Sequence, residues 1–293
     1  MFQKYKYHIL LHFIIFLWGF TGILGKLIHL DFYHIVWNRL LFALIGLAIA
    51  FYFMKISIKI NSFKELARLI GVGILVALHW ITFYKSIQLS TASLGILCLS
   101  TVTLHVTWLE PLIMKRKFSW LEFTLGLSVI GGIYIVSSDF NSNDYEALAY
   151  GLTSAIFAAL FSVFNGRLVK TIPATTMTFY ELLAGFIFLS IILMTKSEFD
   201  ASLFNMTTSD FLWILFLGLV CTSFAFLVNI NALKRLGAFT VSLSINLEPV
   251  YTILLAIVIL EENKLLGPKF YFGSVLIVFV VILNAILKRK EVK

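Results

Sequence analysis

Ten apolar segments, each close to the length of a membrane-spanning helix, are the feature of this sequence that most constrains its fold. A helix needs about 20 consecutive apolar residues to cross the hydrocarbon core of a bilayer. Apolar residues make up 60% of the 293-residue chain and charged residues only 13%, which is more apolar surface than a soluble domain of this length can bury. The sequence therefore predicts an all-α membrane protein with ten transmembrane helices. The predicted spans are residues 8–28, 33–53, 66–86, 92–113, 119–138, 147–168, 174–195, 211–231, 238–260 and 268–287.

Patterns at the helix ends recur between the two halves of the chain. Gly25-Lys26-Leu27 returns as Gly166-Arg167-Leu168, 141 residues later. The segment Ser86–Ala92 returns as Ala232–Ala238, 146 residues later. Because each half holds an odd number of spans, the second copy must lie upside down relative to the first.

We therefore predict two inverted five-helix repeats, the first at residues 1–140 and the second at residues 141–293. Many secondary transporters are built from such repeats, and their substrate sites lie near the bilayer midplane between the two copies. One chain contains both repeats and so could work as a monomer.

The distribution of basic residues predicts that both termini lie in the cytoplasm of a bacterial cell, with the protein in the inner membrane. This orientation places 17 of the 23 Lys and Arg residues in cytoplasmic segments, as the positive-inside rule expects. The net charge of +8 is dispersed over helix ends, where it serves orientation and contact with anionic lipids. We therefore expect the lipid bilayer, and no nucleic acid, as a partner.

Three motifs of the second half and three of the first resemble the two EamA repeats of the drug/metabolite transporter superfamily. The resemblance is closest to exporters of aromatic amino acids and other metabolites. It implies ten helices around a central cavity, with the fifth and tenth spans at the periphery. The motifs are Ala232-Leu233-Lys234-Arg235-Leu236-Gly237-Ala238, Asn246-Leu247-Glu248-Pro249-Val250 and Leu260-Glu261-Glu262, together with Trp18-Gly19, Arg39 and the segment from Tyr84 to Ala92.

The Glu-Pro pairs of the two halves do not correspond. Glu110-Pro111 and Glu248-Pro249 are 138 residues apart, eight short of the 146-residue offset, and eight helical residues span about 12 Å. Glu110 is therefore expected near the cytoplasmic end of its span, and the matching position near Val102-Thr103 has no carboxylate.

Ionisable residues inside the predicted spans are the first candidates for a substrate site, because a charge in hydrocarbon normally faces a cavity or a partner. Arg39 and Glu181 occupy corresponding places in the two repeats, 142 residues apart. They either line one pathway, as an anion-attracting and a cation- or proton-accepting group, or hold the second and seventh spans in place. Glu248 is expected near mid-bilayer. Pro249 removes a backbone donor there, so that Asn246 and Glu248 form either a polar hinge or a simple kink.

Histidine and aromatic side chains supply further candidates in the third and fourth spans. His79, Trp80 and Tyr84 lie in the third span, and Thr101, His105 and Trp108 share one helical face of the fourth. They are interpreted either as a surface that stacks on a substrate or as packing and interface anchors. The predicted substrate-binding residues are Arg39, His79, Trp80, Tyr84, Thr101, His105, Trp108, Glu181, Asn246 and Glu248.

The sequence thus predicts a secondary transporter that exports amino acids or related small metabolites across the inner membrane by alternating access. The alternatives are an exporter of lipophilic cations or drugs, and a membrane scaffold that transports nothing. No nucleotide-binding loop, metal-ligand cluster or nucleophile–base pattern is evident, so we expect no catalytic residues, no cofactor and no metal. Cys98 and Cys221 fall within separate predicted spans, which implies no disulfide framework.

Overall fold

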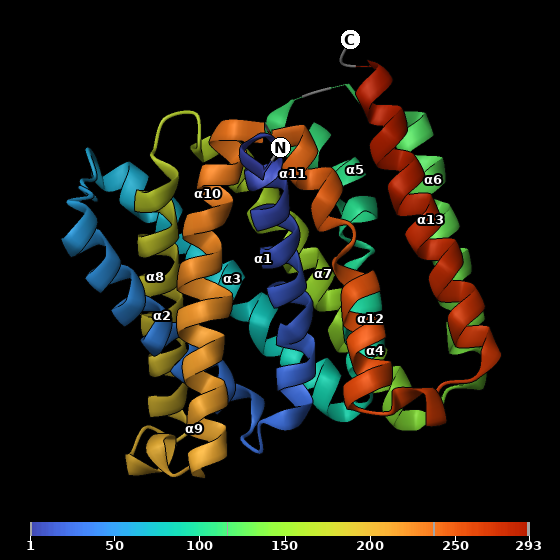
Figure 1. Ribbon diagram of the computed structural model, residues 1–293, viewed down its shortest axis with the longest axis horizontal. Coiled ribbons are helices and arrows are strands. Elements are labelled where there is room, and N and C mark those ends of the chain that lie inside the picture. The colour runs from blue at the N-terminus through green and yellow to red at the C-terminus, as the bar shows by residue number, and fades with distance from the viewer. Residues whose placement is uncertain (1, 116, 237, 292–293) are drawn as a thin grey trace.

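The computed structural model describes residues 2–115, 117–236 and 238–291, and this part of the chain is helical without a strand (Figure 1). Gly237, within one of the family-like motifs, lies outside the described residues. The α-helices are α1 (Phe2–Leu27), α2 (Phe32–Met54), α3 (Phe63–Leu89), α4 (Ala92–Leu99), α5 (Val102–Met114), α6 (Trp120–Val136), α7 (Ser142–Leu168), α8 (Ala174–Thr195), α9 (Thr208–Leu215), α10 (Ala225–Leu236), α11 (Ala238–Ile245), α12 (Glu248–Ile259) and α13 (Pro268–Glu291). Between them lie the 3-10 turns η1 (Ser137–Asp139), η2 (Ala201–Phe204) and η4 (Glu262–Lys264) and the π-helix η3 (Phe216–Phe224).

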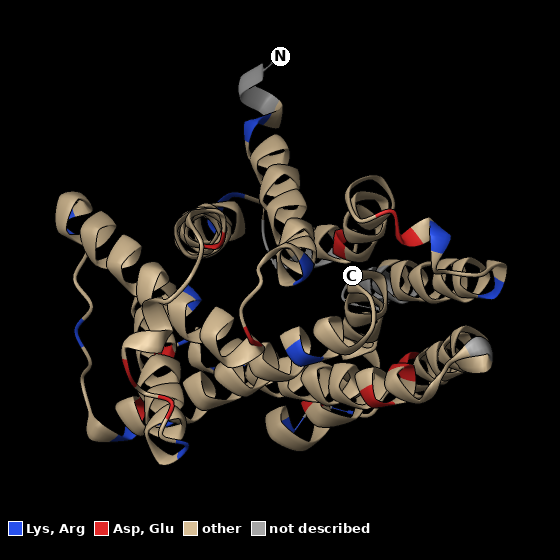
Figure 2. Cartoon of the chain, turned by 90° about the horizontal axis from the view of Figure 1, so that it is seen from below, with Lys and Arg blue, Asp and Glu red and all other residues tan. Residues whose placement is uncertain are grey.

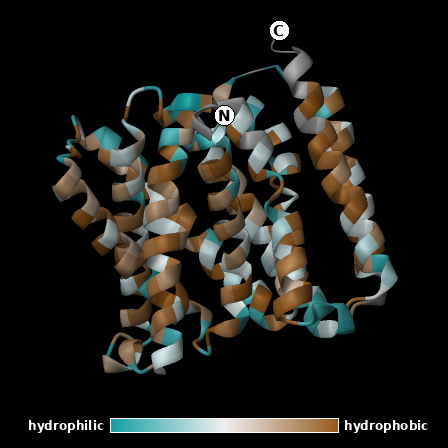
Figure 3. Ribbon diagram, in the orientation of Figure 1, coloured by the Kyte–Doolittle hydropathy of each residue, from teal (hydrophilic) through white to brown (hydrophobic). Residues whose placement is uncertain are grey.

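Seven helical segments of the described chain are long and apolar enough to cross a membrane, and three shorter apolar helices occupy the other predicted positions. A full set of ten spans is therefore not confirmed. Figure 3 shows hydrophobic residues along the helices and hydrophilic ones gathered at the connections. The long segments are Tyr5–Leu27, Phe32–Met54, Phe63–Leu89, Ala92–Met114, Ser142–Leu168, Ala174–Thr195 and Thr208–Leu236, and the shorter ones are Trp120–Val136, Glu248–Ile259 and Pro268–Leu283.

Both ends of the chain lie at the same end of the bundle (Figure 1). We call the opposite end the distal face; it contains the connections at residues 28–31, 90–91, 137–141, 196–207 and 260–267. Hydrogen bonds join the first of these connections to neighbouring helices: Gln88 Nε2 of α3 donates to the Leu30 carbonyl over 2.8 Å, and the His29 N–H donates to Asp210 Oδ1 of α9 over 2.9 Å. Helix α1 runs toward the distal face and α7 runs away from it, so the two halves have opposite orientations (Figure 1).

The fourth predicted span of each half is two helices rather than one. Helix α4 gives way to α5 at Ser100-Thr101, and α11 gives way to α12 at Asn246-Leu247. The Thr101 N–H donates to the Cys98 carbonyl over 3.0 Å, and the Leu247 N–H donates to the Ser244 carbonyl over 3.0 Å. These two tight turns are related by the same 146-residue offset as the sequence repeat.

The eighth predicted span contains a wide turn at its centre. In η3, the hydroxyl of Thr222 donates to the Leu217 carbonyl over 2.8 Å and that of Ser223 to the Gly218 carbonyl over 3.1 Å, each five residues back. Such π-turns are frequent at functional sites because they redirect side chains within a helix. Here the turn directs Thr222 toward α2.

Side chains at the helix starts explain where several helices begin. Ser62 accepts from the Glu65 N–H at the start of α3, and Asn141 and Asp144 form a reciprocal capping box at the start of α7. Each cap satisfies N–H groups that a helix end leaves without partners.

Charged residues are few and scattered over a largely uncharged chain (Figure 2).

The largest buried cluster joins α1, α2 and α3 of the first half to α8 and η3 of the second. Helices α6 and α13 pack against each other at one edge of the bundle (Figure 1), through buried residues that include Val129, Ile133, Ile277 and Val281. Their place at the edge agrees with the expectation for the fifth and tenth spans.

Candidate functional site

Arg39 is the only charged side chain of α2 that is buried, with 4% of its surface exposed. Its Nε donates to Thr222 Oγ1 over 3.0 Å, and its Nη1 donates to the Tyr84 hydroxyl over 3.3 Å. The guanidinium carbon lies 3.8 Å from the centroid of the Trp80 ring, which is a cation–π contact. Three of the sequence candidates, Arg39, Trp80 and Tyr84, therefore form one site.

The hydrogen-bond and ring partners of Arg39 are all neutral. Among the described residues it forms no ion pair, and its third nitrogen, Nη2, has no hydrogen-bond partner. A charged side chain inside a membrane-spanning helix is unfavourable, by about 2.5–3.5 kcal/mol at the helix centre on insertion scales, and Arg39 lies within α2. A planar, permanently charged guanidinium with an unused donor is well suited to bind a carboxylate.

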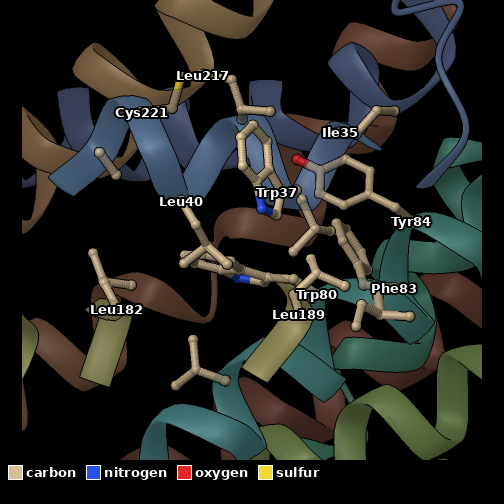
Figure 4. Packing of buried hydrophobic residues seen from close by; sticks show 14 of the residues in the cluster. Ile35, Trp37, Leu40, Trp80, Phe83, Tyr84, Leu182, Leu189, Leu217 and Cys221 are labelled. Atoms are coloured by element: carbon tan, nitrogen blue, oxygen red, sulfur yellow. The ribbon is translucent and has the colours of Figure 1, made fainter. Parts of the chain in front are cut away.

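The site lies where the two halves of the chain meet. Arg39 comes from α2, Trp80 and Tyr84 come from α3, and Thr222 comes from η3 of the second half. Figure 4 shows Trp80 and Tyr84 among the buried residues of these elements, with Leu217 and Cys221 of η3 close by. Gly218 permits this approach, because a Cβ there would lie 3.1 Å from the Arg39 carbonyl oxygen.

His79 is buried five residues before Tyr84 and connects α3 to α7. Its Nδ1 lies 2.8 Å from Ser154 Oγ and 3.1 Å from the Ser154 carbonyl oxygen, while that hydroxyl donates to the His79 carbonyl over 2.9 Å. The ring stacks on Phe83 with centroids 6.1 Å apart. His79 thus joins the two halves and lies within electrostatic range of Arg39.

Glu181 is buried on α8 and pairs with an amide rather than with Arg39. Asn165 Nδ2 donates to Glu181 Oε2 over 3.0 Å, while Oε1 is buried without a hydrogen-bond partner. Arg39 and Glu181 therefore do not form an ion pair, although their positions in the repeat correspond. The pair with Asn165 is a second polar site between α7 and α8.

Glu248 is the first residue of α12, directly after the turn that contains Asn246. Both side chains are half-buried, and Glu248 lies within electrostatic range of Arg39. Pro249 follows at a position where its missing N–H removes no helical hydrogen bond. The predicted kink is therefore a complete interruption of the helix, with a carboxylate at its edge.

Thr101, His105 and Trp108 follow the equivalent turn in the first half. The hydroxyl of Thr101 donates to the Cys98 carbonyl over 2.6 Å, and His105 Nε2 is buried without a partner. His105 and Trp108 meet edge to face, and Trp108 is 37% exposed. The three residues therefore run from a buried turn to the outer surface of α5.

Two cavities lie apart from Arg39. One of about 320 Å³ opens on the distal face between Ser90, Asp144 and Leu266, and one of about 170 Å³ lies between α5 and α7 beside Glu110. Glu110 is four residues from the end of α5, as its offset from Glu248 predicts. Within the described part of the chain, no three His, Cys, Asp or Glu side chains are grouped to hold a metal ion.

Sequence reasoning missed Thr222 and Ser154. Each is a hydroxyl residue in an apolar span, and such residues commonly hydrogen-bond to a neighbouring helix in a membrane. The pair Thr222-Ser223 inside an otherwise apolar segment was the signal that could have identified the partner of Arg39.

The helices and the buried polar cluster define a multi-pass membrane protein with its charged site between two inverted halves. The model of the EamA-like transporter family matches residues 6–138 and residues 146–286, one match in each half. The chain belongs to the EamA-like transporter family, and it is therefore a transporter of the drug/metabolite superfamily rather than an enzyme.

A solved structure described only as "Crystal structure of protein" has the same fold. It is 14% identical in sequence, with a TM-score of 0.68, and the alignment covers 97% of this chain and 99% of the other. At this identity the likeness concerns the fold alone. No curated protein matches the chain significantly.

Proposed function

We propose that the protein is a secondary transporter that exports amino acids, aromatic ones among them, or related small carboxylates by alternating access. Family membership supplies the class: a carrier of small molecules in a lipid bilayer. The substrate, the direction and the mechanism are the proposal.

The single observation that carries the substrate class is the environment of Arg39. A buried guanidinium whose described partners are Thr222, Tyr84 and the face of Trp80 still has a hydrogen-bond donor to offer. A substrate carboxylate would neutralise the charge and accept from this donor. The Trp80 ring would then lie beside the substrate side chain, which favours an apolar or aromatic one.

Alternating access is supported by the position of this site between the two halves. Arg39 reaches Thr222 across their boundary, and each half contains a tight turn in its fourth span. Interrupted helices near the midplane are a common feature of transporters with inverted repeats, because the halves rock around them. Movement about these turns would open the Arg39 site first to one side and then to the other.

We further propose that both termini lie in the cytoplasm and that the protein works as a monomer in a bacterial inner membrane. The charge distribution supports this orientation, since the connections at the termini end hold most of the Lys and Arg residues. The distal face would then be the side to which substrate is released.

Two carboxyl groups favour the second candidate function, export of lipophilic cations. Glu181 has a buried oxygen without a partner among the described residues, and Glu248 is a half-buried carboxylate within electrostatic range of Arg39. Either group could accept a cation or a proton during the cycle. The amino-acid proposal differs in making Arg39, rather than a carboxylate, the residue that recognises the substrate.

Counterflow in proteoliposomes tests the proposal. Vesicles containing the purified protein are loaded with one unlabelled compound, and uptake of its labelled form is followed for a panel of amino acids and a panel of lipophilic cations. Arg39→Lys is the matched variant, because it keeps the positive charge but loses the planar fork and the stacking on Trp80.

The proposal expects saturable uptake of one or more amino acids and a loss of at least about tenfold in Arg39→Lys, the equivalent of one charge-assisted hydrogen bond. Uptake of lipophilic cations alone would support the second candidate. Uptake of neither by correctly inserted protein would contradict transport of these classes.

A further inference from the structure

Glu262 is almost fully buried although it lies in the connection between α12 and α13, with only 2% of its surface exposed. The Ala92 N–H donates to its Oε1 over 2.7 Å and the Ser93 N–H donates to its Oε2 over 3.0 Å. The carboxylate therefore receives two charge-assisted hydrogen bonds from the first turn of α4. A helix N-terminus also stabilises a negative charge. Both the charge-assisted hydrogen bonds and the helix dipole therefore stabilise the contact between Glu262 and α4.

A second bond holds the same short segment of the first half. Ser90, just before α4, donates a hydrogen bond through its hydroxyl to Asp144 Oδ1, in the first turn of α7. Asp144 is itself fixed by the Asn141 N–H, which donates to its other oxygen over 3.1 Å. Residues 90–93 are thus bound by two carboxylates that both come from the second half of the chain.

These contacts lie on the distal face and cross between the two inverted halves. Opening this face by a rocking movement of the halves would separate α4 from the α12–α13 connection. Two backbone N–H groups and a carboxylate would then lose their partners until water replaced them, which is unfavourable. The contact therefore opposes opening of the distal face.

The sequence provides no equivalent contact at the termini end. The 146-residue offset relates Glu262 to Arg116 and Ala92 to Ala238, the first residue of α11. A second such contact would need a carboxylate, and the sequence has Arg116 at the corresponding position, which lies outside the described residues. The two ends of the carrier are therefore not equivalent in charge.

From these contacts we infer that Glu262 is a latch: its carboxylate, bound to the first turn of α4, holds the distal face closed and biases the transporter toward the state open at the termini end. This inference rests on the proposed alternating-access function. It assigns a role to the Leu260-Glu261-Glu262 motif, which the substrate site does not use.

Thiol labelling of Ser93→Cys measures the latch directly. Ser93 is fully buried in the closed contact and its hydroxyl has no hydrogen-bond partner among the described residues, so a thiol is accommodated there. The natural cysteines, Cys98 and Cys221, are also buried, and the chain without Ser93→Cys gives the background. The rate of reaction with a bulky charged maleimide is compared in detergent with and without Glu262→Gln.

Glu262→Gln keeps the size of the side chain but places an amide donor against a backbone donor. We expect labelling of Ser93→Cys to accelerate on the order of tenfold or more, since a charge-assisted hydrogen bond is lost. Glu261→Gln is the matched control, because Glu261 is exposed in the same connection and pairs with Lys264. It should leave the rate unchanged.

An unchanged rate in Glu262→Gln, or an equal acceleration in Glu261→Gln, overturns the latch. Should Glu262→Gln fail to fold, Glu262→Asp and Ser90→Ala provide the test. The first weakens the contact of Glu262 with α4, and the second removes the hydrogen bond between Ser90 and Asp144. Both are expected to accelerate labelling, and unchanged rates in both would equally overturn the inference. Labelling requires no substrate, so its failure is distinguishable from a failure of the transport assay.

Discussion

Arg39 Nε donates a hydrogen bond to Thr222 Oγ1 over 3.0 Å, and this bond joins the second helix of one half to the π-turn of the other. It fixes the plane of the guanidinium above Trp80 and leaves Nη2 without a described partner. Thr222 is therefore a positioning residue, and its effect on transport should pass through Arg39.

Replacing Thr222 by Val removes the acceptor and keeps the size of the side chain. We expect the KM for the transported amino acid to rise about tenfold, because a hydrogen bond to a charged group contributes about 1.5–3 kcal/mol. The maximal rate should change less. Both parameters are measured by initial uptake into proteoliposomes.

Ser223→Ala is the control for this prediction. The Ser223 hydroxyl also joins η3 to α2, through the Ala43 carbonyl at 2.7 Å, whereas the hydrogen bonds of Arg39 within the described part of the chain go to Thr222 and Tyr84. A similar rise in KM for Ser223→Ala would show that general loosening of the interface, and not the position of Arg39, is responsible.

Close packing between α3 and α8 makes a second prediction, at Gly73. A Cβ at this position would lie 2.7 Å from Ala184 Cβ and closer still to the Glu181 carbonyl oxygen, so the two helices would have to separate. Gly73→Ala should lower the free energy of unfolding by about 1–3 kcal/mol. Gly71, on the same helix, faces open space, and Gly71→Ala should be neutral or stabilising.

Thermal unfolding in detergent compares the two variants at Gly73 and Gly71. Equal melting temperatures for both would mean that α3 and α8 are not packed as closely as the structure has them.

The bond between His79 and Ser154 makes a third prediction. Ser154→Ala leaves the buried Nδ1 of His79 with only the Ser154 carbonyl oxygen at 3.1 Å and removes the donor to the His79 carbonyl. The expected loss of stability is about 1–3 kcal/mol, the cost of leaving buried polar groups unpaired. Thr153→Ala is its control, since the Thr153 hydroxyl bonds only within its own helix. A comparable loss in both variants would contradict the role given to Ser154.

Glu248→Gln separates the two candidate functions. The substitution keeps the size of the side chain and removes its negative charge, so recognition of a lipophilic cation should be abolished while uptake of a zwitterionic amino acid persists within a few-fold. The comparison uses the same proteoliposomes and both classes of compound. Loss of amino-acid uptake in this variant would make Glu248, and not Arg39 alone, part of the recognition of that substrate.

Much of this architecture follows from the sequence, because hydrophobic length and the repeat offset depend on local residues. The offset of 146 residues found in the motifs also relates the turns at Thr101 and Leu247. The ninth span, predicted as one helix over residues 238–260, is divided into α11 and α12 by the turn before Glu248. A run of apolar residues does not show that such a turn interrupts the helix.

The site was only partly predictable, because contacts between helices that are distant in the sequence do not follow from local residues. Helical position indicates that Arg39 is buried, and it groups Trp80 with Tyr84 on α3. It does not indicate which distant residue meets the guanidinium. Thr222 was missed and Glu181 was considered as a member of the same pathway, because the pairing of Glu181 with Asn165 depends on how α7 and α8 pack.

Binding of an amino acid compared with its own decarboxylated amine tests the central claim most directly. The two ligands differ only in the carboxylate that Arg39 is proposed to bind, and isothermal titration of the purified protein measures both. The account predicts that the amino acid binds, that the amine binds at least about tenfold more weakly, and that Arg39→Lys removes this difference. Equal affinity for the two ligands in the unaltered protein would contradict it.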